Sequence, residues 1–156
     1  MADLAEGEVA PAFKAKDTHG NTVRLADFKG RFVVLYFYPK DDTPGCTIEA
    51  CAFRDDYEKF KMKGVAVLGV SMDSQESHRK FVDKYHLPFP LLLDENAAIS
   101  KAYGAYGEKN FLGIKSMGVK RKTFLIGKDG RLARVWNKVL PLGHSRDVLK
   151  AIESLE

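Results

Sequence analysis

Cysteine is scarce in this sequence. Only two occur among 156 residues, Cys46 and Cys51, and four residues separate them. A disulfide framework needs more cysteines that join distant parts of a chain, and a tetrahedral structural zinc site needs four ligands, so neither fits. A bridge between such close neighbours would also remove little entropy from the unfolded chain. The pair is therefore more consistent with a reactive role than with a structural one.

Long apolar runs and targeting signals are also missing. No stretch approaches the ~20 apolar residues of a membrane-spanning helix. The acidic start of the chain lacks the basic and apolar regions of a secretory signal. We therefore expect a cytoplasmic protein, because thiols are kept reduced in that compartment. P-loop, dinucleotide-binding and His-Glu-x-x-His patterns are absent, so we expect no metal, flavin or nucleotide cofactor.

Charge of one sign is not concentrated anywhere in the chain. Lys and Arg total 25 against 21 Asp and Glu, a net charge of +4, and the densest basic cluster, residues 115–122, holds no aromatic residue. Nucleic-acid-binding proteins show denser basic patches or a recognisable module, so we expect neither a nucleic-acid nor a membrane partner. Repeats and linkers are lacking too, which predicts a single domain over residues 1–156.

The histidines form no pattern either. They are scattered, and none lies at metal-ligand spacing with another, so we expect them at the surface or in helix caps. The four are His19, His78, His86 and His144.

What the sequence does contain is a regular alternation of strand and helix patterns. Apolar runs rich in β-branched and aromatic residues predict strands, two of which form a hairpin around a turn at 128–130. The strands are expected at 31–38, 65–71, 90–94, 121–126 and 132–136. Helical spacing predicts helices at 43–64, 74–85, 95–103 and 145–155, with a long loop at 104–118. This order indicates an α/β fold of thioredoxin-like type, with a central mixed β-sheet flanked by helices.

Cys46 lies in the first turn of the helix that follows the strand at 31–38. Open α/β folds usually place their sites at this carboxyl edge of the sheet. Thr43 and Pro44 predict an N-cap followed by proline at the first helical position. Unpaired N–H groups and the positive end of the helix dipole favour an anion there. A thiolate is such an anion, and cysteines so placed are more acidic than free cysteine, which predicts a nucleophile.

Cys51 follows five positions later on the same predicted helix. Helical geometry separates the two Cα atoms by about 8.7 Å, and direct bridging is disfavoured beyond about 7 Å. If the two sulfurs join, the first turns of the helix must unwind, which implies a folded thiol form and a locally unfolded disulfide form. The alternative is that Cys51 is simply a small apolar core residue.

The spacing Pro39-x-x-x-Thr43-x-x-Cys46 resembles the active-site signature of the peroxiredoxins. The wider run from 36 to 55 is similar to the peroxiredoxin Q branch, also called bacterioferritin comigratory protein. The segment 118–126 looks like the part of these proteins that presents an arginine. The resemblance extends from residues 10–13 to the last helix and so covers nearly the whole chain.

The resemblance implies an atypical two-cysteine, thioredoxin-dependent peroxidase that reduces hydrogen peroxide and organic hydroperoxides. Cys46 would be the peroxidatic cysteine, and Cys51 or an external thiol would resolve its sulfenic acid. If Cys51 does so, a Cys46–Cys51 disulfide forms. Thr43 would offer its hydroxyl to the thiolate and the peroxide. Pro39 would shield the sulfur from water, and Arg121 would hold a positive charge beside it. A thioredoxin-like protein would be the reductant, and an intramolecular disulfide lets a monomer complete the cycle.

Two other functions are compatible with a reactive cysteine pair. A thiol-disulfide oxidoreductase could use the same fold, but such enzymes usually carry Cys-x-x-Cys. A redox-controlled client-binding module would expose apolar surface when the helix opens, and it would not require polar groups at Thr43 or Arg121.

Overall fold

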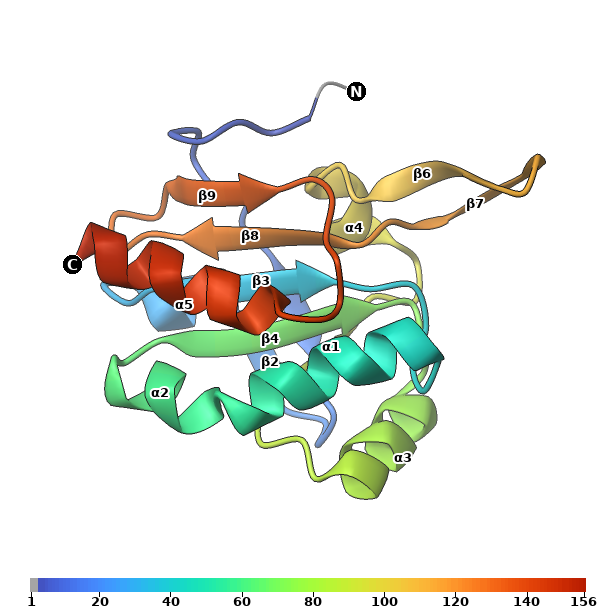
Figure 1. Cartoon of the computed structure of the whole chain (residues 1–156), viewed down its shortest axis with the longest axis horizontal. Coiled ribbons are helices and arrows are strands. Elements are labelled where there is room, and N and C mark those ends of the chain that lie inside the picture. Colours follow the sequence, from blue (N-terminus) through green and yellow to red (C-terminus); the bar gives the residue numbers. More distant parts are fainter. Residues whose placement is uncertain (1–2) are drawn as a thin grey trace.

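The computed structural model describes residues 3–156, which are built around a five-stranded sheet (Figure 1). The strand order is β5-β4-β3-β8-β9. The strands are β3 (Val33–Phe37), β4 (Ala66–Ser71), β5 (Leu91–Leu93), β8 (Lys122–Ile126) and β9 (Leu132–Trp136). The first three run parallel, whereas β8 pairs antiparallel with β3 and β9 antiparallel with β8. The mixed sheet predicted from the sequence is therefore confirmed.

Strand β3 lies in the middle of this sheet, and all five of its side chains are buried. Because side chains alternate along a strand, they supply two cores on opposite faces. Val34 and Tyr36 pack with residues of α1 and α5, while Leu35 and Phe37 pack on the other face. Burial on both faces explains why this strand has a continuous apolar run.

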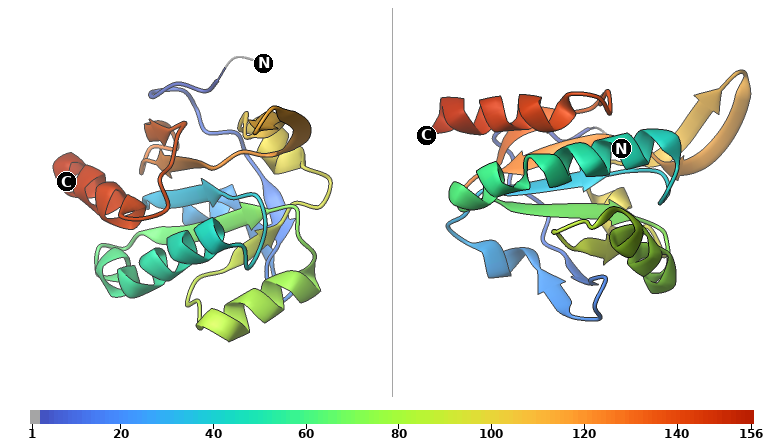
Figure 2. Two further views of the ribbon diagram at one scale, coloured as in Figure 1. Left: turned by 45° about the vertical axis from the view of Figure 1, so that its right-hand side comes forward. Right: turned by 60° about the horizontal axis from the view of Figure 1, so that its bottom comes forward.

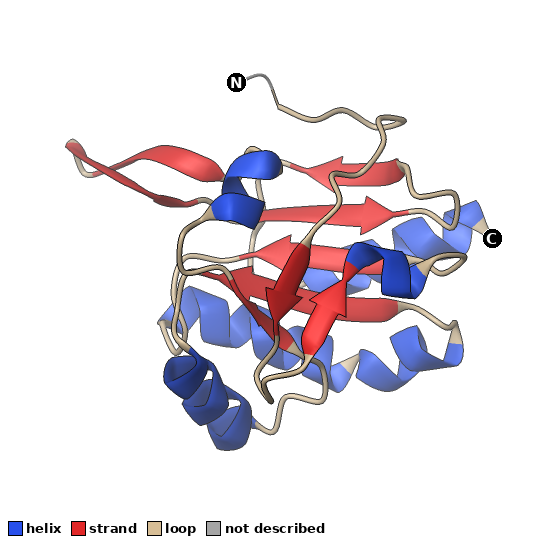
Figure 3. Ribbon diagram, turned by 180° about the vertical axis from the view of Figure 1, so that it is seen from behind, coloured by secondary structure: helices blue, strands red, loops and turns tan. Residues whose placement is uncertain are grey.

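Helices cover the two faces unequally. The helices are α1 (Pro44–Asp55), α2 (Tyr57–Met62), α3 (Gln75–Tyr85), α4 (Ala98–Ala102) and α5 (His144–Leu155). α1, α2 and α5 lie over one face of the sheet (Figure 1). α4 lies on the opposite face (Figure 3). The same face carries a two-stranded ribbon of β1 (Lys14–Lys16) and β2 (Thr22–Arg24) and the 3₁₀ turn η1 (Leu25–Phe28). Among the described residues, no helix has the length and apolarity to cross a bilayer.

The prediction of one helix over residues 43–64 was wrong, because the chain breaks between α1 and α2 at Asp56. Asp56 has φ −93° and ψ 0°, and its N–H bonds to the carbonyl oxygen of Ala52. Ser145, at the start of α5, donates its hydroxyl to the Asp56 carboxylate at 2.7 Å. A contact with a helix nearly 90 residues away therefore stabilises the break, and no local pattern announces it.

The expected long loop at 104–118 was also wrong, since it contains the antiparallel hairpin of β6 (Tyr106–Phe111) and β7 (Ile114–Val119). The turn residues Leu112 and Gly113 both have positive φ, 53° and 81°, as a tight two-residue hairpin turn requires. Most of β7 is exposed, so neither strand needs alternating apolar residues. The hairpin projects away from the body (Figure 2).

Candidate active site

Cys46 is the third residue of α1 and is 1% exposed. The end of β3 and a connecting turn deliver the chain to this helix, and Pro44 occupies its first position, as predicted. The N–H of Thr47 bonds to the carbonyl oxygen of Thr43 at 2.8 Å, which closes the first turn around Cys46. The sulfur is therefore buried where the helix dipole stabilises an anion.

Thr43 occupies the N-cap position, but its side chain makes no cap hydrogen bond. Its hydroxyl donates instead to the carbonyl oxygen of Lys40 at 2.9 Å. With its hydrogen engaged in this way, Thr43 Oγ1 can accept a hydrogen bond from an incoming O–H group. In this geometry the hydroxyl is an acceptor for a substrate, and the expected donation to the thiolate would require it to rotate.

Arg121 lies at the junction of β7 and β8 and reaches the cysteine from 75 residues away. Its Nη2 is 3.3 Å from Cys46 Sγ, and its Nη1 donates to Glu49 Oε1 at 2.8 Å. Burial alone would lower the pKa of Arg121, but the charges of Cys46 and Glu49 raise it on balance. A Cβ at Gly45 would lie 3.1 Å from Nη2, so glycine at that position allows the close approach. The arginine predicted from the sequence is thus beside the sulfur.

Glu49 is a site residue to which the sequence analysis assigned no role. Its side chain is fully buried, and Oε2 has no hydrogen-bond partner among the described residues. Burial raises the pKa of this carboxyl to about 7, although Arg121 acts in the opposite direction. Glu49 follows Cys46 by three positions and shares the inward face of α1 with Ala50 and Phe53. A charged residue on an apolar helix face was the signal that could have identified it.

Tyr36 brings a second buried polar atom without a partner to this region. Its ring stacks on Phe53 at a centroid distance of 4.8 Å, and its hydroxyl has no hydrogen-bond partner within the described part of the chain. Burial raises the pKa of Tyr36 well above its ordinary value, and the charges of Glu49 and Cys46 add to this effect. Buried polar atoms are normally satisfied, so the two open ones, on Glu49 and Tyr36, are exceptions in this core.

Cys51 lies on the same continuous helix as Cys46 and is partly exposed. Neither cysteine forms a disulfide within residues 3–156. This is the thiol form. In it, helical geometry separates the Cα atoms of Cys46 and Cys51 by about 8.7 Å. Partial exposure also makes Cys51 a poor core residue. Pro39 is half-buried two residues after the end of β3, and its shielding of the sulfur stays a prediction.

The expectation that all four histidines lie at the surface or in caps was wrong for two of them, since His78 and His144 are buried. His144 Nε2 lies 2.8 Å from Thr123 Oγ1, and its ring meets Trp136 edge-on at 5.5 Å. Burial lowers the pKa of His144 to about 4. Hydrogen bonds to other elements hold both rings inside, and helical spacing gives no sign of them.

Most of the chain matches proteins that are already known. The sequence model of the AhpC/TSA family matches residues 7–135. Peroxiredoxin Bcp of Bacillus subtilis (strain 168) is 46% identical over 149 residues, covering 96% of this chain and 95% of that protein. Chloroplastic peroxiredoxin Q of Sedum lineare is 44% identical over 157 residues, covering 100% and 82% respectively.

Solved structures are similar to this chain over nearly its whole length. A cysteine-to-serine mutant of peroxiredoxin Q from Xylella fastidiosa superimposes with a TM-score of 0.91 at 32% identity, covering 99% of each chain. Bacterioferritin comigratory protein of Xanthomonas campestris gives a TM-score of 0.88 at 33% identity, covering 97% of this chain and 99% of that one. The thioredoxin-like fold predicted from the sequence is confirmed by these similarities.

Proposed function

The chain belongs to the AhpC/TSA family, in its peroxiredoxin Q and Bcp branch, and we propose from this premise how its own residues carry out the reaction. Proteins of this branch are thiol-dependent peroxidases, and so is this one. One observation carries the assignment of residues: Arg121 Nη2 lies 3.3 Å from the sulfur of Cys46, which is buried in the first turn of α1.

In the first step, the Cys46 thiolate attacks one peroxide oxygen and the O–O bond breaks. The sulfur becomes a sulfenic acid, and the other oxygen leaves as water or an alcohol once it has gained a proton. Negative charge moves from sulfur to the leaving oxygen during this step. Arg121 and the N–H groups at the start of α1 are already in place to stabilise that charge, and the Thr43 hydroxyl can accept from the peroxide O–H.

In the second step, the Cys51 thiolate attacks the Cys46 sulfenic sulfur, the S–O bond breaks as the disulfide forms, and the hydroxide leaves as water once it has gained a proton. The first turns of α1 must unwind, because five helical positions hold the two Cα atoms about 8.7 Å apart. An external dithiol protein of thioredoxin type, the reductant general to this family, then reduces the bridge. Hydrogen peroxide and organic hydroperoxides are the proposed substrates, and the structural study of the Xanthomonas protein concerned alkyl peroxide reduction.

The oxidoreductase and client-binding alternatives have less support. Four residues separate the cysteines, and a helix must unwind before they join, whereas exchange enzymes keep their two sulfurs poised. A binding module has no use for a guanidinium shared between Cys46 and Glu49. A cytoplasmic location, a monomeric state and a single domain over residues 1–156 stay predictions.

Peroxide consumption with and without a thioredoxin system tests the proposed roles. The reduced protein should consume about one peroxide per chain by itself and turn over many times with the reductant. Cys46→Ser should abolish both activities. Cys51→Ser should keep the first oxidation and form no internal disulfide. Normal peroxide removal by Cys46→Ser would overturn the assignment of the nucleophile, and an unimpaired cycle in Cys51→Ser would remove Cys51 from the resolving role.

A further inference from the structure

A buried polar network joins the active-site loop, residues 39–43, to α3. Its centre is Asp41, which is almost fully buried although it is charged and lies in a loop. The Asp41 carboxylate has three side-chain partners. Tyr38 donates its hydroxyl to Oδ1 at 2.6 Å, Ser77 donates to Oδ2 at 2.8 Å, and His78 Nδ1 lies 2.7 Å from Oδ2.

The partners of His78 hold both of its ring nitrogens. Nδ1 faces the Asp41 carboxyl group, and Nε2 lies 3.0 Å from the carbonyl oxygen of Leu92. A carbonyl oxygen only accepts, so Nε2 carries hydrogen, while Nδ1 and Asp41 Oδ2 share the other hydrogen bond. The side chains of Asp41 and His78 are 3% and 0% exposed. Burial, followed by the charge of Asp41, raises the pKa of Tyr38 well above its ordinary value, which keeps its hydroxyl a donor to this carboxylate.

The loop is also held through its backbone. The N–H of Asp41 donates to Asp73 Oδ2 at 2.9 Å, and the hydroxyl of Ser71, the last residue of β4, donates to the same oxygen at 2.6 Å. Ligand atoms of Asp41, Asp73 and His78 lie within 4.8 Å of one another. All three groups already have hydrogen-bond partners, so the network is complete without a cation.

This network fixes the residues that lead directly to the nucleophile. Asp41 precedes Thr43 by two positions, and the Thr43 hydroxyl is oriented by the carbonyl oxygen of Lys40 in the same loop. We propose that Asp41 and His78 are positioning residues for the oxidation of Cys46. The hydrogen bond between them holds the loop so that Thr43 and the first turn of α1 meet the sulfur and the peroxide. The inference rests on the proposed role of Cys46.

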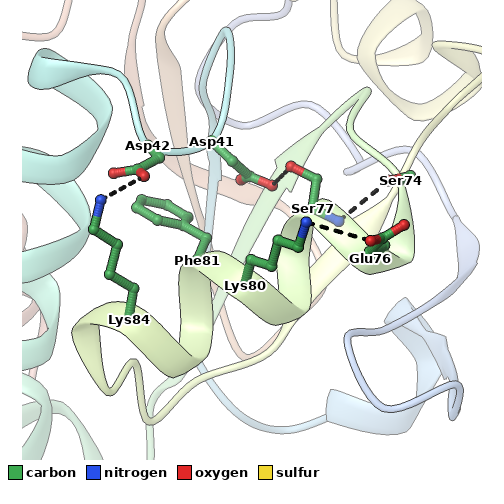
Figure 4. A pocket seen from close by; sticks show the side chains of 8 residues that line it. All are labelled: Asp41, Asp42, Ser74, Glu76, Ser77, Lys80, Phe81 and Lys84. Carbon is green, nitrogen blue, oxygen red and sulfur yellow. Dashed lines mark hydrogen bonds and ion pairs between the residues drawn. The ribbon is translucent and has the colours of Figure 1, made fainter.

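The structure supplies a matched control between the same loop and the same helix. Lys84 donates to Asp42 Oδ2 at 2.8 Å (Figure 4). Tyr85 donates to Asp42 Oδ1 at 2.9 Å. Here the two charged side chains are 58% and 41% exposed. Exposed ion pairs hold little energy, so Lys84→Met should leave peroxide oxidation unchanged.

Two substitutions of one residue separate positioning from mere stability. In His78→Asn the amide nitrogen stands near the place of Nδ1 and keeps a donor to Asp41, but the bond to Leu92 is lost. In His78→Gln the amide nitrogen stands near Nε2 and keeps the bond to Leu92, but Asp41 loses one of its three side-chain partners. Each variant thus gives up one buried hydrogen bond of His78.

Two quantities are measured for each variant. The first is the rate constant of Cys46 oxidation by peroxide, monitored through the fluorescence of Trp136, the one tryptophan of the chain. The second is the urea concentration at the midpoint of unfolding. His78→Gln should be about ten- to one-hundred-fold slower than the parent, because small displacements of reacting groups cost this much. His78→Asn should keep most of the rate at a similar loss of stability. Equal rates in the two variants, or a loss in Lys84→Met as large as in His78→Gln, would overturn the proposal.

A milder variant keeps the test decisive if His78→Gln does not fold. Ser77→Ala removes one of the three side-chain partners of Asp41. It should slow Cys46 oxidation, whereas the control Lys84→Met should keep the rate of the parent. An unchanged rate in Ser77→Ala would then refute the positioning role. The parent protein separates the two levels of the argument. If its Cys46 is not oxidised, the proposed function fails; if it is oxidised but the variants match it, only the positioning role fails.

Discussion

Glu49→Gln should change how the stability of the protein depends on pH. Burial raises the pKa of Glu49 from 4.5 to about 7, so the folded state holds this proton more tightly than the unfolded state does. The stabilisation is fully present below about pH 4.5 and is lost as the pH rises to about 7. A shift of this size corresponds to roughly 3 kcal/mol. Glutamine cannot ionise but can still accept the hydrogen bond from Arg121, so the variant should not show this loss.

His144 makes the parent curve misleading on its own. Burial lowers the pKa of His144 from 6.5 to about 4, so the unfolded state takes up this proton first as the pH falls. Its contribution is present above about pH 6.5 and is lost as the pH falls towards 4, which is the opposite direction to Glu49. The two effects largely cancel in the parent protein. The informative quantity is therefore the difference between the variant and the parent, in which His144 drops out.

Urea unfolding of the reduced proteins at several values between pH 4.5 and 8 measures this difference. The unfolding free energy of Glu49→Gln minus that of the parent should rise by roughly 3 kcal/mol between pH 4.5 and 7 and stay level above it. Glu153→Gln, on the solvent-facing side of α5, is the control for the same substitution at an exposed position. A flat difference for Glu49→Gln would show that folding does not raise the pKa of Glu49, and the description of the site would then be wrong.

Two further predictions concern catalysis. Arg121→Met removes a positive charge 3.3 Å from Cys46 Sγ. The interaction of two unit charges at this distance is worth about 1 kcal/mol in water and about 5 kcal/mol at an effective dielectric constant of about 20. The rate of Cys46 oxidation, measured by stopped flow, should therefore fall about ten- to thousand-fold. Arg121→Lys should recover part of the rate, and an undiminished rate in Arg121→Met would make the residue structural. After peroxide treatment, hydrogen exchange should show lost amide protection at residues 44–51 but not in α2, and retained protection in a disulfide-bonded protein would contradict the unwinding step.

Patterns that come from burial could be predicted, and those that come from long-range contacts could not. Strand β3 is apolar along its whole length because both of its faces are covered, so its sequence announces it. The β6–β7 hairpin is mostly exposed and is set by its turn, which leaves no apolar pattern to detect. The break at Asp56 depends on Ser145, far away in the chain.

The site residues, too, divide into those that local sequence patterns predict and those that depend on long-range contacts. Cys46 could be placed at a helix start from local signals, and Arg121 could be named by resemblance, but only the fold shows their 3.3 Å contact. Glu49 was within reach of sequence analysis, since it shares a helix face with Cys46 and Phe53. The hydrogen bond between Asp41 and His78 joins residues 37 positions apart, and neither position is unusual in sequence.

Identification of the oxidised atom tests the central claim most directly. Reduced Cys51→Ser would receive one equivalent of peroxide together with a sulfenate-trapping reagent, and its peptides would be examined by mass spectrometry. The reagent should be found on Cys46 alone, at close to one per chain, and the parent protein under the same conditions should instead yield a Cys46–Cys51 disulfide. Consumption of the peroxide with Cys46 left as a thiol would contradict the account.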